Sequence, residues 1–279
     1  MRKILKQLNS FFIDVIEDAK SIILVILFCR TRNKKFSAKE KTINILGNGP
    51  SLIDVLNSKD EAVSNPIMVT NSFCESDAFF RIKPEYYILI DPLFFKDNVN
   101  DYVKNQQTQI QNIFQKIDWS ITLLMPAQNK KTKLAKFFGT LDKINIIYIN
   151  ITPIDGHMNL RHFLYKLGLG TPQCQNVINA ALMVAINGGF QEIILYGADH
   201  SWFKDFIHNE DGDLCEKRHH FYNNNHSLQK ISPGRIEFMC GAMQKCFKTY
   251  RYIKAYSDQM NVRIINKTNN SFIDVFPRI

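Results

Sequence analysis

Two adjacent histidines, His219 and His220, lie in a polar stretch that also contains Lys217 and Arg218. An imidazole has a pKa near neutrality in its unperturbed state, so it can remove a proton from a hydroxyl group. We therefore predict that one of these two histidines is a general base. Asp199 would either orient that histidine or help to hold a ribose. The lysine and arginine would neutralise a phosphate. The alternative is that all of these side chains are solvated or structural.

A metal site is a second possibility for the histidines, because His200 lies upstream of the pair. Their spacing matches no zinc-binding pattern of the usual kind. We therefore predict no metal ligand in this chain and no cofactor.

A glycine-containing turn, Gly47–Leu52, follows the first predicted strand. Glycine lets the backbone turn tightly and approach a phosphate or ribose closely. The amides of Gly49 and Ser51 are expected to point toward an anion at a helix start, for which Pro50 presets φ. The third glycine of the dinucleotide fingerprint is missing, and a plain strand-to-helix turn is the alternative.

Small polar residues also follow the other predicted strands and the start of a late helix. Each alone could be a helix cap, but their repetition at one sheet edge indicates recognition of a base, a ribose or a phosphate. The candidate nucleotide-binding residues are Asn48, Gly49, Pro50, Ser51, Asn71, Ser72, Asp91, Gln175, Asn176, Asp199, His200 and Ser201.

The elements that must position these residues are short β-branched or aromatic runs separated by helical segments. Nearly continuous apolar strands in this arrangement predict an α/β fold whose mostly parallel sheet is covered on both faces. Ligands bind such sheets beyond the carboxyl ends of the strands. The predicted strands are residues 42–46, 67–70, 86–90, 121–125, 144–149, 192–196 and 262–265.

The clearest helix is predicted over Thr171–Asn187, with apolar residues at helical spacing that face the sheet. Thr171-Pro172 has the residue types of an N-cap and first turn, and Gly188-Gly189 those of a stop. Gln175 and Asn176 would then lie near the first turn, where a phosphate is favoured.

Residues 1–40 form a separate N-terminal segment, in which apolar residues 21–29 lie between basic stretches. A membrane-spanning helix needs about 20 apolar residues, so this run is too short to span. We predict either an interfacial helix on an anionic inner leaflet or a core helix followed by a basic loop. A linker would begin near residue 30, and one domain would cover 41–279.

Composition bounds the class of protein. The chain has 279 residues, a net charge of +9 and six cysteines without a C-x-x-C pair. A basic chain favours anionic partners, and the absence of nucleic-acid-binding motifs argues against DNA or RNA. Unpaired cysteines favour a reducing compartment, so we expect a cytoplasmic protein, peripheral on the inner face of the membrane.

The strand-end motifs resemble those of bacterial sialyltransferases of glycosyltransferase family 42. They also resemble a related bacterial group, long described as a domain of unknown function, that includes flagellin-associated glycosyltransferases. The resemblance runs through separated motifs over roughly residues 42–278. These motifs are Gly47–Leu52, Asn71, Tyr87–Pro92, Ala185–Ser201, His220-Phe221, Ile265–Thr268 and Phe276–Arg278.

This resemblance implies a GT-A-like Rossmann domain with a mobile lid, here placed at about 203–234, and inverting transfer from a CMP-activated sugar. It implies donor contacts by Asn48 and Asn71, and a catalytic base at His220. The sequence departs from the family at Asp91, where an asparagine is usual, and at Asn176, where a hydroxyl residue is usual. The family's two phosphate-contacting tyrosines have no clear counterpart.

The expected function is transfer of sialic acid or a related nonulosonic or keto sugar to a surface glycan. The acceptor would be an oligosaccharide or lipid-linked glycan of lipopolysaccharide or capsule; the oligomeric state is left open. One alternative is a pyrophosphokinase of the same wider group, which would use ATP and magnesium held by Asp91 and Asp199. Others are a noncatalytic nucleotide-binding protein and, less favoured, an NAD-dependent oxidoreductase.

Overall fold

A computed structural model of the chain describes residues 2–29, 38, 40–57, 64–97, 99–217 and 228–278. Its centre is a seven-stranded sheet in the order β10-β6-β1-β2-β3-β4-β5, in which every neighbouring pair is parallel. The strands are β1 Thr42–Leu46, β2 Ile67–Thr70, β3 Tyr86–Ile88, β4 Ile121–Pro126, β5 Ile144–Ile149, β6 Glu192–Tyr196 and β10 Arg263–Asn266.

All seven predicted strands are present, and the predicted α/β class is confirmed. Strand β3 is shorter than the predicted 86–90 because the Ile90 N–H is bound by the Asn71 Oδ1 atom, 3.2 Å away. A side chain from the end of β2 thus takes the place of the next ladder bond.

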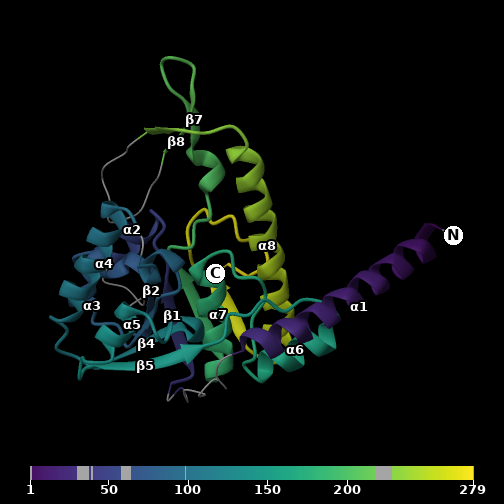
Figure 1. Cartoon of the computed structure of the whole chain (residues 1–279), viewed down its shortest axis with the longest axis horizontal. Helices are drawn as coiled ribbons and strands as arrows, with labels where there is room; N and C mark the ends of the chain where they lie inside the picture. The colour runs from purple at the N-terminus through teal and green to yellow at the C-terminus, as the bar shows by residue number, and fades with distance from the viewer. Residues whose placement is uncertain are drawn as a thin grey trace.

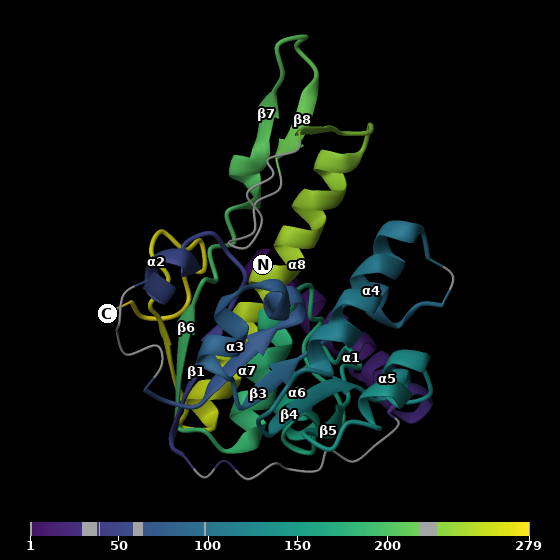
Figure 2. The same cartoon turned by 90° about the vertical axis from the view of Figure 1, so that its left-hand side faces the viewer.

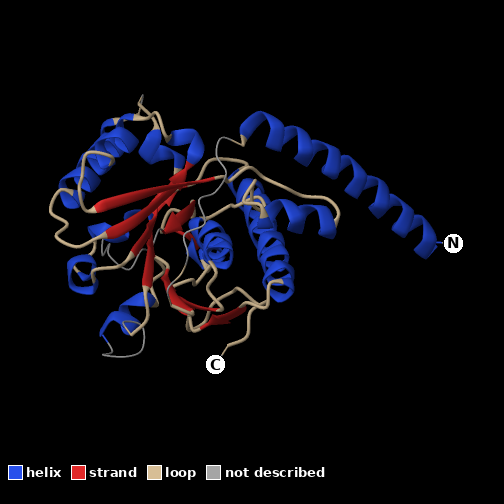
Figure 3. Cartoon of the chain, turned by 90° about the horizontal axis from the view of Figure 1, so that it is seen from below, coloured by secondary structure: helices blue, strands red, loops and turns tan. Residues whose placement is uncertain are grey.

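Helices cover both faces of the sheet (Figures 1 and 3). One hydrophobic core lies between the sheet and the helices α6, α7 and α8, and a second lies between the sheet and α2, α3, α4 and α5. Burial on both faces explains why the strands read as continuous apolar runs. The helices are α1 Arg2–Phe28, α2 Leu52–Asn57, α3 Ala78–Ile82, α4 Asp101–Phe114, α5 Lys133–Phe138, α6 Met158–Lys166, α7 Val177–Gly188 and α8 Arg235–Gln259.

The sheet changes direction at β1. The chain moves outward from β1 through β2 to β5, and then returns so that β6 pairs with the other side of β1. In doubly wound sheets the crevice at such a switch point is where ligands bind. The turns after β1 and β6 therefore mark the place to look for a site.

Helix α7 begins later than predicted. Its N-cap is Asn176, whose side chain accepts a hydrogen bond from the Asn179 amide, and its C-cap is Gly189 in the left-handed conformation. The predicted stop is confirmed, whereas the predicted start at Thr171-Pro172 is wrong. Thr171 instead forms a parallel β-bridge with Pro153, and its backbone N–H and carbonyl make hydrogen bonds with Thr152 and Ile154 in the loop after β5.

Helix α1 projects from the domain (Figures 1 and 3), so it is not a buried core helix. Within the described residues, no helix is both long and apolar enough to cross a membrane. Residues around the expected boundary at 40 lie partly outside the described part of the chain, and the division into 1–40 and 41–279 stays a prediction.

The expected lid contains a small antiparallel sheet of β7 Phe206–His208, β8 Leu214–Lys217 and β9 Leu228–Lys230. Strands β7 and β8 stand beyond the carboxyl edge of the main sheet, beside the start of α8 (Figure 2). Gly212 adopts a positive φ of 80° in the turn that joins them. Movement of this segment stays a prediction.

All six cysteines are free thiols. Three of them, Cys74, Cys215 and Cys246, are buried and pack as small apolar side chains.

Candidate functional site

A pocket of about 250 Å³ opens at the switch point, between the residues that follow β1, β2 and β6 and the start of α7. Eight of the twelve candidate nucleotide-binding residues line it: Asn48, Gly49, Pro50, Asn71, Asn176, Asp199, His200 and Ser201. Six further lining residues were not among the candidates: Thr70, Val177, Ile178, Gly197, Trp202 and Asp205. The other four candidates, Ser51, Ser72, Asp91 and Gln175, do not line it.

The turns after β1 and β6 are joined by direct backbone contacts. The Gly49 amide donates to the Gly197 carbonyl at 2.9 Å, and a Cβ added at Gly49 would lie 1.9 Å from Asp199 Oδ2. Only glycine allows this approach, because any larger residue would collide with the carboxylate.

Asp199 also binds Ser51. Its carboxylate accepts from the Ser51 hydroxyl at 2.8 Å and from the Ser51 amide at 3.3 Å. The expectation that the amides of Gly49 and Ser51 hold an anion is therefore wrong, since both amides already have acceptors within the protein. Burial raises the pKa of Asp199, while the hydrogen bonds from Ser51 act in the opposite direction.

Asn48 contributes an unused hydrogen-bond acceptor to the pocket. Its Nδ2 donates to the Thr70 carbonyl at 3.0 Å, which fixes the side chain toward the end of β2. Its Oδ1 is buried and finds no partner among the described residues. Buried polar atoms nearly always have a partner, so this oxygen can accept an N–H or O–H group from a molecule bound in the pocket.

Asn71 is held in place by two contacts. Its backbone has a positive φ of 42°, its Oδ1 accepts from the Ile90 amide, and its carbonyl accepts from the Tyr87 hydroxyl. Asp91 caps the short 3₁₀ helix Pro92–Phe95 by accepting from the Leu93 amide at 2.9 Å. The carboxylate of Asp91, which stands where the resembled sialyltransferases have an asparagine, therefore has a local structural role.

The start of α7 faces the same pocket through Asn176, Val177 and Ile178. The first amides of a helix have no acceptor within the helix, and the helix dipole adds partial positive charge at this end. The arrangement favours a phosphate here. Gln175 lies outside the pocket, with its amide donating to Asn179 Oδ1 at 3.3 Å.

His200 is buried in the pocket wall with a left-handed backbone, φ 56°. Its Nε2 accepts from the Tyr250 hydroxyl at 2.6 Å and lies 3.0 Å from Asn176 Nδ2. Burial disfavours the charged ring and lowers the pKa of His200 to about 4, against the opposing effect of the Ala198 carbonyl.

Because its ring is neutral and its Nε2 is already occupied, His200 is suited to positioning rather than to proton transfer. Its ring packs on Trp202 at 4.6 Å between centroids, and its partner Asn176 also donates to Cys246 Sγ at 2.9 Å. The histidine thus connects the turn after β6 to the N-cap of α7 and to α8.

Asp205 is the titratable pocket residue that the sequence interpretation missed. It lies at the end of the 3₁₀ helix η5, Trp202–Asp205. Burial and the nearby Glu216 raise its pKa to about 6, and Lys217 opposes the shift. A carboxyl group that titrates near neutrality can act as a general base. An isolated aspartate in the predicted lid segment gives no such signal in sequence.

The two histidines predicted to include the general base, His219 and His220, lie outside the described residues, as does Arg218. Lys217 is the last residue of strand β8. The role of these residues stays a prediction. Within the described part of the chain, no group of three or more histidine, cysteine, aspartate or glutamate side chains is placed to hold a metal ion. Asp91 and Asp199, the two proposed magnesium ligands, each bind protein donors.

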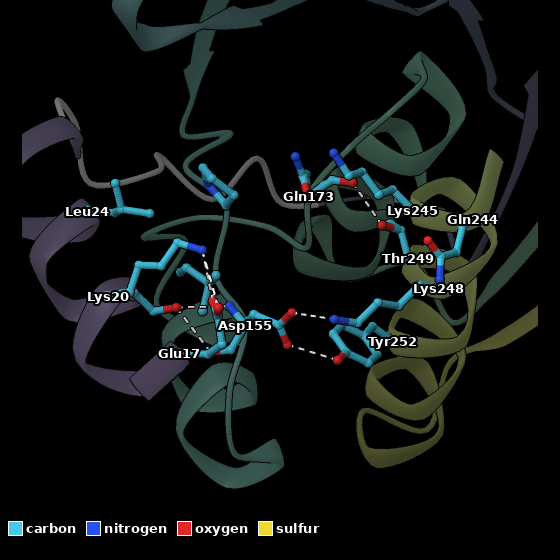
Figure 4. Close-up of a pocket in the computed structure, with 13 residues that line it drawn as sticks. Glu17, Lys20, Leu24, Asp155, Gln173, Gln244, Lys245, Lys248, Thr249 and Tyr252 are labelled. Atoms are coloured by element: carbon cyan, nitrogen blue, oxygen red, sulfur yellow. Dashed lines mark hydrogen bonds and ion pairs between the residues drawn. The ribbon is translucent and has the colours of Figure 1, made fainter. Parts of the chain in front are cut away.

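A second cavity, of about 450 Å³, lies between α1, the loop after β5 and α8 (Figure 4). It shares no lining residue with the switch-point pocket. Asp155 lies at its centre and accepts from Lys248 Nζ at 2.6 Å and from the Tyr252 hydroxyl at 2.8 Å. Burial by itself would raise the pKa of Asp155, but these bonds outweigh it and the pKa is lowered. The cavity therefore lies next to the contact between α1 and the loop after β5, which we call the α1 joint.

Comparison with known proteins supports the fold. No protein-family model matches the sequence, and no curated protein matches it. Among solved structures, the MAf glycosyltransferase from Magnetospirillum magneticum AMB-1 is similar with a TM-score of 0.51 and 13% identity, over 94% of this chain. The match spans only 37% of that longer chain. A mammalian sialyltransferase crystallised with Gal-beta-1-3GalNAc-ortho-nitrophenol matches with a TM-score of 0.40 and 8% identity, over 88% of this chain and 78% of that one.

Proposed function

We propose that this protein is a glycosyltransferase that binds a nucleotide-activated sugar in the switch-point pocket. The observation that carries the proposal is the buried, unpartnered Oδ1 of Asn48 in a pocket that also contains the start of α7. A nucleoside supplies N–H and O–H donors, and its phosphate suits a helix N-terminus. The similarity of fold to the MAf glycosyltransferase is consistent with this activity.

The donor we propose is a CMP-linked sialic acid or a related nonulosonic or keto sugar. This choice follows the motif resemblance, in which Asn48 and Asn71 contact the donor. In our proposal the phosphate lies against the first turn of α7, next to Asn176, where negative charge that develops on the leaving group is stabilised.

The reaction is an inverting substitution. A general base removes the proton of an acceptor hydroxyl, and the resulting oxygen forms a bond to the anomeric carbon. The bond from that carbon to the phosphate oxygen breaks, and CMP leaves with the electron pair. His220 is the base implied by the resemblance, His219 is its neighbour, and Asp205 is a further candidate because it lines the pocket.

The acceptor would be an oligosaccharide or a lipid-linked glycan of lipopolysaccharide or capsule. The segment at about 203–234 would close over the donor and exclude water, which suppresses hydrolysis of the activated sugar. We place the enzyme in the cytoplasm, peripheral on the inner face of the membrane.

A thermal-shift panel tests the donor assignment. The protein is melted with CMP, CDP, UDP, GDP and ATP, each with and without magnesium, because a ligand that binds only the folded state raises Tm. Selective stabilisation by CMP without magnesium supports the proposal. UDP or GDP selectivity keeps glycosyl transfer and rejects the CMP donor, whereas magnesium-dependent ATP binding supports a pyrophosphokinase instead.

Variants then locate the ligand. Asn48→Ala removes the unpartnered oxygen and should weaken CMP binding by about tenfold or more, as expected for a lost buried hydrogen bond. Ser72→Ala is the matched control, because Ser72 is buried nearby but does not line the pocket. Equal CMP affinity in the Asn48→Ala variant and the wild type would contradict this placement. Loss of transfer in His220→Ala but not in His219→Ala would assign the base.

A further inference from the structure

Helix α1 faces the domain with its polar side. Within residues 8–28, its half-buried or buried positions recur at helical spacing: Asp14, Glu17, Asp18, Ser21, Leu24 and Val25. Three of these are acidic and one is a serine, whereas the opposite side is mostly apolar. This is the reverse of an ordinary surface helix, which packs its apolar face inward.

Specific hydrogen bonds fix this orientation. The Ser21 hydroxyl accepts from the Asp155 amide at 2.9 Å and donates to its carbonyl at 3.1 Å. Asp18 accepts from the His157 amide at 2.8 Å and pairs with its Nδ1 at 2.6 Å. A Cβ at Gly156 would lie 2.1 Å from Asp18 Oδ1, so the loop is shaped for this contact. The helix cannot rotate its apolar side inward without breaking these bonds.

The outward side of α1 has a long row of exposed apolar residues. The most exposed are Ile26 at 74%, Ile16 at 66% and Phe12 at 62%. Monomeric soluble proteins rarely expose large contiguous apolar patches unless they serve as an interaction surface. The remaining exposed apolar residues of the helix are Leu8, Phe11, Ile13, Val15, Ile22, Ile23, Leu27 and Phe28.

The width of this surface argues against a helix of a second copy as its cover. Phe12, Ile16, Ala19, Ile23 and Ile26 fit the central positions of a coiled-coil heptad. The flanking positions of that heptad, which are usually charged, are Leu8, Ile13, Val15, Lys20, Ile22 and Leu27. With one lysine among six, the apolar arc is wider than a two-helix seam requires, and it suits insertion into a bilayer surface.

The charges point to the same partner. The three acidic residues of 8–28 lie on the half-buried side, and the ammonium of Lys20 pairs with Glu17 at 3.1 Å beside the second cavity. The outward apolar side therefore has no acidic residue to repel lipid phosphates. In sequence, the helix begins with Arg2, Lys3 and Lys6 and is followed by Arg30, Arg32, Lys34 and Lys35. Basic residues at both ends complement an anionic surface.

We propose that α1 lies flat on an anionic lipid bilayer, with Phe12, Ile16, Ile23, Ile26 and Leu27 inserted at the boundary between headgroups and acyl chains. The polar side, bound to the loop after β5, then holds the domain against the membrane. This proposal stands on the geometry of α1 and does not depend on the donor or the reaction.

Vesicle co-sedimentation of the full chain tests the proposal. The vesicles contain phosphatidylcholine alone or phosphatidylcholine with phosphatidylglycerol. The variant Ile23→Glu/Ile26→Glu places two carboxylates on the apolar side of α1. The matched control, Tyr102→Glu/Gln109→Glu, adds the same charge at two exposed positions of α4. Thermal melting checks that both variants are folded.

We expect the wild type and the control to bind vesicles that contain phosphatidylglycerol, and the α1 variant to bind at least about tenfold more weakly. Binding of the wild type should fall as salt is raised, because part of the attraction is electrostatic. Light scattering without vesicles measures the oligomeric state. The proposal would be overturned if the wild type is a dimer that stays in the supernatant with vesicles, while the α1 variant is a monomer. That result would mean that a second copy of the chain covers the apolar side of α1. Equal binding to both vesicle types, or by the α1 variant and wild type, would also overturn it.

Discussion

The buried state of His200 predicts a specific loss of stability in acid. Its pKa is about 4 in the folded protein, against 6.5 as the ordinary value. The folded state therefore binds fewer protons than the unfolded chain between these values. The resulting stability is present above about pH 6.5 and is lost as the pH falls toward about 4.

The size of this effect follows from the two pKa values. The full contribution of His200 is about 3 kcal/mol, at about 1.4 kcal/mol for each pH unit. Between pH 7 and pH 5 about 2 kcal/mol of it should be lost, because at pH 5 most of the unfolded chains are protonated at this residue. Asp199 and Asp205, whose pKa values are raised, act in the opposite direction.

Comparison with a variant isolates the histidine from those carboxylates. His200→Asn keeps a residue that tolerates the left-handed backbone and cannot be protonated in this range. Urea unfolding at pH 7 and pH 5 gives the free energy of unfolding for both proteins. We expect the wild type to lose about 2 kcal/mol more than the variant. His208→Asn is the matched control, since His208 is exposed on β7, and it should follow the wild type. Parallel losses in the wild type and in His200→Asn would refute the argument that His200 is buried in its neutral form.

Three further predictions concern the site and the α1 joint. Gly49→Ala should lower the free energy of unfolding by about 1–3 kcal/mol and reduce nucleotide binding, because the new Cβ collides with Asp199; unchanged urea unfolding and affinity would contradict the close approach of the two turns. If Asp205 is the base, transfer should rise with pH around its pKa of about 6, and Asp205→Asn should remove that limb of the pH–rate profile; an unaltered profile would leave the histidines as candidates. Gly156→Ala should release α1, because the added Cβ would collide with Asp18 at a position whose backbone φ is 101°. Limited proteolysis should then cut α1 faster, while the melting temperature of the domain stays the same. An unchanged cleavage rate would show that the contact between α1 and the loop tolerates the methyl group.

The fold was largely predictable because its signals are local. Most strands of the main sheet are buried on both faces and so appear as short apolar runs, which set their positions and indicate a parallel sheet. The end of α7 was equally clear, since Gly189 adopts a left-handed conformation that favours glycine. Its start was misplaced because Thr171-Pro172 has the residue types of a cap. Asn176 caps the helix because the preceding residues are held in the loop after β5.

The site was predictable in its location but not in its hydrogen bonds. Polar residues after parallel strands must gather at one edge of the sheet, and eight of the twelve candidates line the pocket. The sequence could not show that Asp199 accepts from the Ser51 amide and the Gly197 carbonyl from the Gly49 amide, or that Asp91 caps a 3₁₀ helix. Both depend on which donors lie within reach of a carboxylate in the folded chain.

The sequence by itself determined the α/β class, the strands and the edge of the sheet at which a ligand would bind, because these follow from periodic burial and chain direction. It also showed an amphipathic N-terminal helix. Only the tertiary structure decided which side of that helix faces outward, which atom of Asn48 is left without a partner, and that burial depresses the pKa of His200 and raises that of Asp205. Each of these depends on contacts between segments far apart in the chain, and local pattern carries no information about them.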